Sequence, residues 1–148
     1  MAKYEVTTRP IWVALLVATQ AVLAVIAIPS GALFLADPSG GLLRAQFIMP
    51  YLTKSLPFIH DFAPVGIWLV VVYGVLPILF DVGLLRRVRL AWLLTIVLGL
   101  TVVVWIAVEM ALFAAIGFTP LYPLIGGIGA ATVFVSSLPS VRRYYSRR

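Results

Sequence analysis

The stretch "LAWLLTIVLGLTVVVWIAVEMALFAAIGF", residues 90–118, contains a single charged side chain, that of Glu109. A helix crosses the hydrocarbon core of a bilayer with about 20 apolar residues, and this stretch is longer than that. An uninterrupted apolar run of this length predicts a transmembrane helix. It also indicates the fold class of the whole chain, because similar runs occur elsewhere in the sequence.

Apolar runs recur at residues 11–28, 64–85 and 121–139, which predicts four spans in one membrane domain, residues 1–148. The composition agrees, since 63% of the 148 residues are hydrophobic and 11% are charged, whereas a soluble domain is about 25% charged. We therefore predict an all-α polytopic membrane protein, a bundle of four transmembrane helices. The first run exceeds the apolar core of a signal peptide, so we expect it to be retained as an anchor.

The basic residues are unevenly distributed between the two sides of this bundle. Arg44 and Lys54 fall in the connection between the first two spans, and the other nine fall on the opposite side: Lys3, Arg9, Arg86, Arg87, Arg89, Arg142, Arg143, Arg147 and Arg148. By the positive-inside rule, both termini are predicted to be cytoplasmic, in the cytoplasmic membrane. The net charge of +6 is thus mainly a signal of topology, and we expect no nucleic-acid partner.

The basic tail, residues 140–148, has a second use. Its arginines can bind anionic lipid headgroups, with Tyr144 and Tyr145 at the interface. The predicted headgroup ligands are Arg142, Arg143, Arg147 and Arg148.

The connection at residues 29–62 is far longer than the about 2–8 residues that usually join two helices of a bundle. It is rich in Leu, Phe and Ile, so a disordered aqueous loop is not expected. We predict an apolar extracytoplasmic cap, turned at "DPSGG" and helical at residues 42–54, with a kink or an end near Pro50. The cap either seals the bundle or binds a lipid tail, a quinone or another protein.

Glu109 is the strongest candidate for a functional side chain, because a carboxylate inside a membrane is costly. Trp105 lies one turn away on the same helical face and is a candidate partner. Three interpretations remain open: a neutral or paired structural glutamate, a proton or cation site, and an acid–base group. The other candidates outside the bundle are Arg44, His60 and Asp61, and Asp61 is favoured as a helix cap.

Two more polar side chains fall within the predicted spans. Gln20 is near the middle of the first span, where a glutamine commonly forms a hydrogen bond to another helix. It also remains a candidate for ion or ligand binding. Asp81 is near the cytoplasmic end of the second span, and we predict an ion pair with the arginines at residues 86–89.

Small residues mark two further features. In the fourth span, Gly126 with Ala130 and Gly127 with Ala131 have the spacing that lets another helix approach closely. The partner is either a helix of the same chain or another subunit. In the second span, Gly74 and Pro77 predict a kink.

A resemblance rests on Asp37-Pro38-Ser39-Gly40, "LPFIHDFAPVG" at residues 56–66, Gly74 and Pro77, "WIAVEMALF" at residues 105–113, and "TPLYPLIGGIG" at residues 119–129. With these features the chain resembles a group of uncharacterised small four-span prokaryotic membrane proteins, and more loosely the DoxX-like four-helix proteins linked to quinone-associated chemistry. The resemblance implies a four-helix bundle with an outer cap and no particular activity.

The sequence excludes several classes of enzyme. It has no cysteine, hence no thiol nucleophile or thiolate metal site, and no Walker, GxSxG or HExxH motif. We predict no cofactor, no metal and no catalytic residue, and favour a non-enzymatic protein that binds membrane lipid or serves as an accessory or assembly subunit, as a homo-oligomer or in a larger complex. The alternative is an oligomeric minimal transporter or channel that uses Glu109. The third interpretation is a lipid- or quinone-linked enzyme with Glu109, His60 and Asp61 as proton carriers.

Overall fold

The computed structural model describes residues 10–114, 117 and 119–146. Within these residues every element is a helix and no strand occurs, as predicted. The elements are α1 (Ile11–Ala36), the 3-10 helix η1 (Gln46–Ile48), α2 (Met49–Ser55), α3 (Ala63–Trp68), the π-helical η2 (Leu69–Val75), α4 (Leu76–Leu85), α5 (Arg89–Leu112), α6 (Leu121–Ser137) and α7 (Pro139–Ser146).

Three segments are long and apolar enough to cross a membrane: α1, the continuous run of α3, η2 and α4, and α5. The fourth predicted span is the bent pair of α6 and α7, which meet at 60°. Many large apolar side chains point outward along these helices, including Val25, Val97 and Val104, which are 71%, 56% and 59% exposed. Such an apolar exterior is compatible with insertion into lipid.

The helices form two close pairs, each held where two glycines meet. A Cβ atom on Gly31 of α1 would lie 2.7 Å from the carbonyl oxygen of Gly66 in α3. A Cβ atom on Gly99 of α5 would lie 3.0 Å from the carbonyl oxygen of Gly129 in α6. Because glycine has no side chain, the paired backbones can approach this closely.

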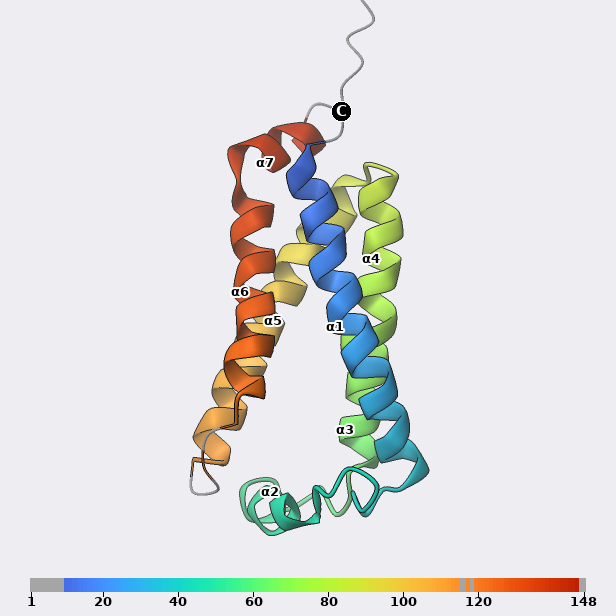
Figure 1. Cartoon of the computed structure of the whole chain (residues 1–148), viewed down its shortest axis with the longest axis vertical. Coiled ribbons are helices and arrows are strands. Elements are labelled where there is room, and N and C mark those ends of the chain that lie inside the picture. Colours follow the sequence, from blue (N-terminus) through green and yellow to red (C-terminus); the bar gives the residue numbers. More distant parts are fainter. Residues whose placement is uncertain (1–9, 115–116, 118, 147–148) are drawn as a thin grey trace, which may run out of the picture.

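The two pairs come together near α7 and diverge toward the opposite end, where the segment containing α2 lies across the gap (Figure 1). At the α7 end, Tyr145 is 2% exposed and its hydroxyl donates to the backbone carbonyl of Leu84 at 2.9 Å. Its ring stacks on Trp92, with centroids 6.3 Å apart. One end of the bundle is therefore closed by tight packing and the other by the cap.

The first span is longer than predicted, because α1 continues past Ile28 through Pro29 to Ala36. Its total length is about 39 Å at 1.5 Å per residue, more than the about 30 Å of a hydrocarbon core. The cap is shorter as a consequence and comprises residues 37–62. The third span ends earlier than predicted, because α5 ends at Leu112. Residues 115, 116 and 118 of the predicted span lie outside the described residues.

The predicted helix at residues 42–54 is confirmed only from Gln46 onward, since residues 42–44 form a turn. The cap contains η1 followed by α2, and Pro50 stands in the first turn of α2 rather than at its end. Proline fits there because the first-turn N–H groups have no partner within the helix. The predicted "DPSGG" turn is present, since Asp37 Oδ1 accepts hydrogen bonds from the Ser39 N–H at 3.1 Å and the Ser39 hydroxyl at 2.6 Å.

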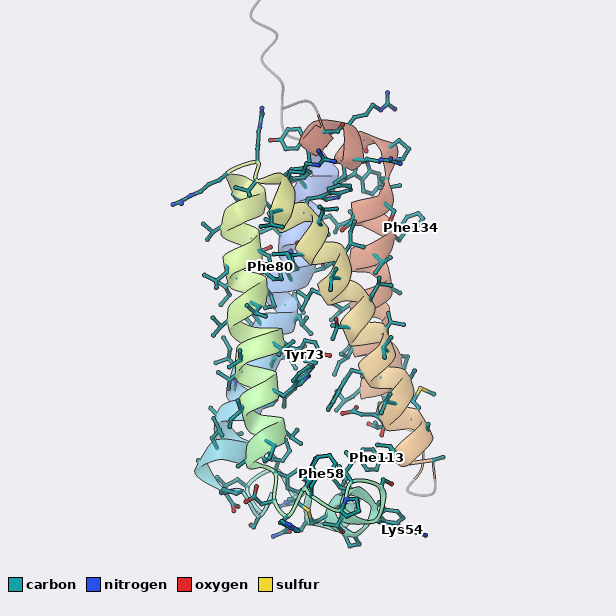
Figure 2. The ribbon with its side chains drawn as sticks, turned by 180° about the vertical axis from the view of Figure 1, so that it is seen from behind. Lys54, Phe58, Tyr73, Phe80, Phe113 and Phe134 are labelled. Carbon is teal, nitrogen blue, oxygen red and sulfur yellow. The ribbon has the colours of Figure 1, made fainter. Side chains whose placement is uncertain are left out.

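The irregularity predicted at Gly74 and Pro77 is a π-helical turn, η2, followed directly by α4 with Pro77 in its first turn. Wider π turns occur where a regular helical hydrogen bond is lost, and the missing N–H of proline causes such a loss. η2 carries Tyr73, whose hydroxyl donates to the carbonyl of Thr101 in α5 at 3.2 Å. This hydrogen bond joins the two helix pairs near the middle of the bundle (Figure 2).

Candidate functional site

A cavity of about 180 Å³ lies between the cap and the diverging helix ends. The cap contributes Ile48, Leu52, Leu56, Ile59 and Phe62, and the helices contribute Phe34, Val65, Leu69, Trp105, Val108, Glu109 and Leu112, with Phe113 just after α5. Glu109 is the one ionisable side chain in this lining. The carboxyl group singled out in the sequence therefore faces an apolar chamber.

The cap holds its position over the cavity through a small hydrophobic core of its own. Leu52 and Phe62 are 6% and 3% exposed, and the ring of Phe62 stacks on Phe34 near the end of α1, with centroids 4.8 Å apart. Figure 2 shows Phe113 at the end of α5, next to the cap. The cap and the ends of two helices together form the walls, so the cavity exists only in the folded arrangement.

Trp105 belongs to the cavity wall, and its ring contacts two further aromatic rings outside the lining. The ring of Trp105 stacks on Trp68 of α3, with centroids 5.8 Å apart, and meets Tyr73 edge-on at 6.5 Å. Trp105 precedes Glu109 by one helical turn, and both residues line the cavity. The aromatic contacts position the ring of Trp105 on the same helical face as Glu109.

An apolar chamber with one hydrogen-bonding group suits a ligand that is mostly hydrocarbon. Ligand sites are typically apolar, with few polar groups that fix orientation. An engineered apolar cavity of about 150 Å³ stays dry and binds benzene, so this cavity has room for a ring or several methylene groups.

Arg44 lies outside this cavity, in a neighbouring pocket of about 390 Å³. The two hollows share Ile48 and Phe113 in their walls. Arg44 has a left-handed backbone with φ 53°, which is uncommon for a residue other than glycine. The backbone N–H of Ala45 donates to the carbonyl of Gly40 at 2.8 Å and closes this turn.

His60 and Asp61 lie outside the lining of the cavity. His60 is exposed. Asp61 Oδ1 accepts a hydrogen bond from the Ala63 N–H at 2.9 Å, at the first residue of α3, so Asp61 caps this helix as predicted. The structure thus places Glu109 and Trp105 together and keeps Arg44, His60 and Asp61 apart from them.

Gln20 lies in a separate polar layer inside the bundle. Its Nε2 donates to Asp81 Oδ1 at 2.8 Å, and Gln20 is fully buried. The predicted ion pair of Asp81 with residues 86–89 is replaced by this hydrogen bond, because Asp81 faces α1 rather than the turn after α4. Gln20 Oε1 has no partner among the described residues.

The small residues of α6 that were predicted to make the close helix contact, Gly126, Gly127, Ala130 and Ala131, do not make it. Gly129, which faces Gly99, makes it, whereas a Cβ atom on Gly126 would meet only Ile106 at 3.5 Å. A Cβ atom on Gly127 would meet nothing within 4 Å, and Ala130 is exposed. Ala131 is partly buried. Gly126, Gly127 and Ala130 line an open groove between α5 and α6.

The predicted basic tail is the helix α7, packed across the bundle end. Arg142 and Arg143 are exposed, while Arg147 and Arg148 lie outside the described residues. The prediction that both tyrosines lie at the interface is wrong for Tyr145, which is buried. Tyr144 is partly buried, and its hydroxyl accepts a hydrogen bond from Arg87 Nε at 2.6 Å.

No group of three or more His, Cys, Asp or Glu side chains that could hold a metal ion occurs among the described residues. The sequence reasoning missed most of the cavity wall, above all Phe34 and Phe62. The aromatic residues on either side of the cap were the available signal, but their spacing along the chain does not show that they meet.

Nothing matches this chain among protein-family models, curated proteins or solved structures. The resemblance to small four-span membrane proteins therefore stays a prediction. The function has to be argued from the site itself.

Proposed function

We propose that this chain is a non-enzymatic integral membrane protein that binds part of a hydrophobic membrane molecule, such as a lipid chain, in the cavity under the cap. The observation that carries the proposal is the cavity of about 180 Å³ with its apolar walls and the single carboxyl group of Glu109. The chamber lies at one end of the bundle, where the two helix pairs diverge. A ligand from the surrounding bilayer has the right polarity to enter it.

The orientation of the chain is part of the same proposal. The helix ends near α7 carry Arg86, Arg87, Arg89, Arg142 and Arg143, and the cap carries Arg44 and Lys54. By the positive-inside rule the α7 end faces the cytoplasm and the cap faces outward. With the bent pair of α6 and α7 counted as a fourth span, we infer that both termini are cytoplasmic.

The role of Glu109 in this proposal is to fix the ligand through a hydrogen bond. Its carboxyl group is the polar point in an otherwise apolar lining, so a hydroxyl, an amine or an amide on the ligand finds its partner there. The rest of the ligand contacts the rings and branched side chains of the cap.

The proposal is tested by measuring the lipid that stays bound. The protein is purified in mild detergent, and copurified molecules are extracted and quantified by mass spectrometry. Val108→Phe enlarges a side chain of the cavity wall, and Val104→Phe is the matched control, one turn away on α5 and outside the lining. Their exposed fractions are similar, 45% and 59%. We expect Val108→Phe to lose most of the bound molecule and Val104→Phe to retain it.

Glu109→Gln keeps the size of the side chain and a hydrogen-bonding oxygen. We expect it to weaken the binding of a ligand that donates to Glu109 and to leave the purely apolar contacts intact. If the wild type and Val108→Phe carry the same lipids in the same amounts, the cavity holds no ligand and the proposal fails.

Transport is the second candidate, and one observation favours it. The layer of Gln20, Asp81, Thr95, Thr132 and Ser136 places buried polar groups inside the bundle, with the exposed fraction of each at 8% or less. Polar groups at this depth often mark ion or proton pathways. Proton or cation flux into vesicles, measured for the wild type and Asp81→Asn, distinguishes this function from binding alone.

An accessory role is compatible with lipid binding. The open groove between α5 and α6, lined by Gly126, Gly127 and Ala130, has room for a helix of a second copy or of a larger membrane complex. The mass of the protein–detergent complex, from light scattering, tests whether the chain forms homo-oligomers.

A further inference from the structure

The end of the bundle opposite the cap carries a separate hollow, of about 430 Å³, between α5, α6 and α7. It forms where the chain bends by 60° from α6 into α7. Its lining consists of Arg89, Trp92, Leu93, Ile96, Ser137, Arg142 and Ser146. Arg89 and Arg142, which come from different helices, therefore line the same hollow, and no carboxylate is in this lining.

The bend has a local cause. Leu138 has an extended backbone, with φ −59° and ψ 137°, as expected for a residue that precedes a proline. Pro139 then begins α7, and Val141 and Tyr145 bury one face of that helix against the bundle. Because α7 is fixed in this way, Arg142 on its other face is held next to Arg89, the first residue of α5.

Neither guanidinium has a partner of its own within the described part of the chain. Two neighbouring arginines differ in this respect. Arg87 donates to the Tyr144 hydroxyl and lies over its ring at 4.4 Å, and Arg143 Nε donates to the carbonyl of Pro139 at 3.2 Å. Arg89 and Arg142 thus remain available for an anion.

The acidic side chains give no competing partner. Among the described residues, Asp37, Asp61 and Glu109 lie at or near the cap, and Asp81 is bonded to Gln20. The hydroxyl groups of Ser137 and Ser146 donate to backbone carbonyls within their own helices. Among the described residues, therefore, no carboxylate balances the positive charge at this hollow.

The apolar floor continues from the hollow along α5. Leu93, Val97 and Leu100 follow Arg89 at helical spacing on one face, with exposed fractions of 43%, 56% and 50%. A molecule with an anionic head at Arg89 and a hydrocarbon tail along this face would match both the basic hollow and the apolar face of α5. The dimensions of the hollow and its position at a helix end suit a phosphate group at the membrane surface.

We propose that Arg89 and Arg142 bind the phosphate group of an anionic phospholipid in this hollow, with an acyl chain along α5. Arginine pairs with phosphate through two parallel hydrogen bonds, which makes two arginines from separate helices a selective anion site. This site is separate from the cap cavity and does not depend on the function proposed for it. Of the tail arginines predicted to bind headgroups, this site uses Arg142, and it adds Arg89 from α5.

The test compares two double variants that remove the same charge. The full-length protein in detergent is titrated with dioleoyl phosphatidylglycerol, and bound lipid is counted by native mass spectrometry. Arg89→Gln with Arg142→Gln removes both proposed ligands, and Arg86→Gln with Arg143→Gln is the control at the same end of the bundle. We expect the first pair to weaken binding by about 30-fold and the control pair by less than about 3-fold.

Three results would overturn the proposal. Equal losses in the two double variants would indicate a general basic surface instead of a site. Equal affinity of the wild type for dioleoyl phosphatidylcholine and dioleoyl phosphatidylglycerol would show that the headgroup charge is not selected, and this comparison needs no variant. Displacement of the lipid by inorganic phosphate at low millimolar concentration would indicate a site for a free anion.

Discussion

Gly31→Ala tests whether the glycine contact between α1 and α3 decides the architecture. The added Cβ atom would lie 2.7 Å from the carbonyl oxygen of Gly66, whereas ordinary contact begins at 3.4 Å. The two backbones must therefore separate by about 0.7 Å, and overpacking of this kind costs about 1–3 kcal/mol. Since the obstacle is backbone, no side-chain rotation can relieve it.

The matched control is Gly127→Ala in α6, where an added Cβ atom meets nothing within 4 Å. Both changes raise helix propensity by the same amount, about 1 kcal/mol, so the difference between the variants isolates the contact. For a chain of this length we expect Gly31→Ala to melt roughly 5 °C below Gly127→Ala. Thermal unfolding in mild detergent, followed by tryptophan fluorescence and checked by size-exclusion chromatography, measures the difference.

If Gly31→Ala melts at or above the temperature of Gly127→Ala, α1 and α3 do not meet at Gly31 and Gly66. The reasoning about two close helix pairs then fails. The cavity would also need revision, because Phe34, which follows Gly31 in α1, forms part of its wall.

Two further predictions concern polar groups. Hydrogen bonds from the Ser39 hydroxyl and the Leu42 N–H lower the pKa of Asp37 below 3.8. We therefore expect the carboxylate to stabilise the turn above pH 3.8 and this stabilisation to be lost as the pH falls through the lowered pKa. A carboxyl-detected NMR titration measures the pKa, and a value at or above 3.8 contradicts the prediction. We expect Gln20→Leu to lower the free energy of unfolding more in the wild type than in the Asp81→Leu variant. In a double-mutant cycle of unfolding, the coupling energy between the two residues should be about 0.6–1.7 kcal/mol. A coupling energy of zero would show that the hydrogen bond contributes nothing.

The long apolar runs predict the long helices, but the predicted ends of two of these helices differ from the structure. The predicted end of α1 at Ile28 was wrong because Pro29 suggested a helix end, whereas the helix continues through this proline to Ala36. Proline removes one hydrogen bond, and in a membrane segment the neighbouring helix and nearby side chains compensate for the loss. The carbonyl that Pro29 leaves without its regular donor is that of Val25, and the Ser30 hydroxyl donates to the next carbonyl, that of Ile26, at 2.8 Å.

The candidate site was predicted only in part. Glu109 and Trp105 were found because a carboxyl group in an apolar run is conspicuous and helical spacing gives its neighbours. Arg89 was counted as a topology signal alone, since nothing in its sequence context shows that the bend at Leu138 brings Arg142 beside it. Asp81 was assigned to nearby arginines for the same reason, because sequence distance favoured them over Gln20.

The sequence by itself determined that this protein is helical, apolar on its exterior and biased in charge between its two ends. These properties follow from composition and periodicity, which are local. Only the tertiary structure decided that the helix pairs diverge beneath the cap, that Phe62 meets Phe34, and that Gln20 meets Asp81. Such contacts join residues far apart in the chain, and they depend on the crossing of helices at glycines and on the bends at prolines, which no local pattern specifies.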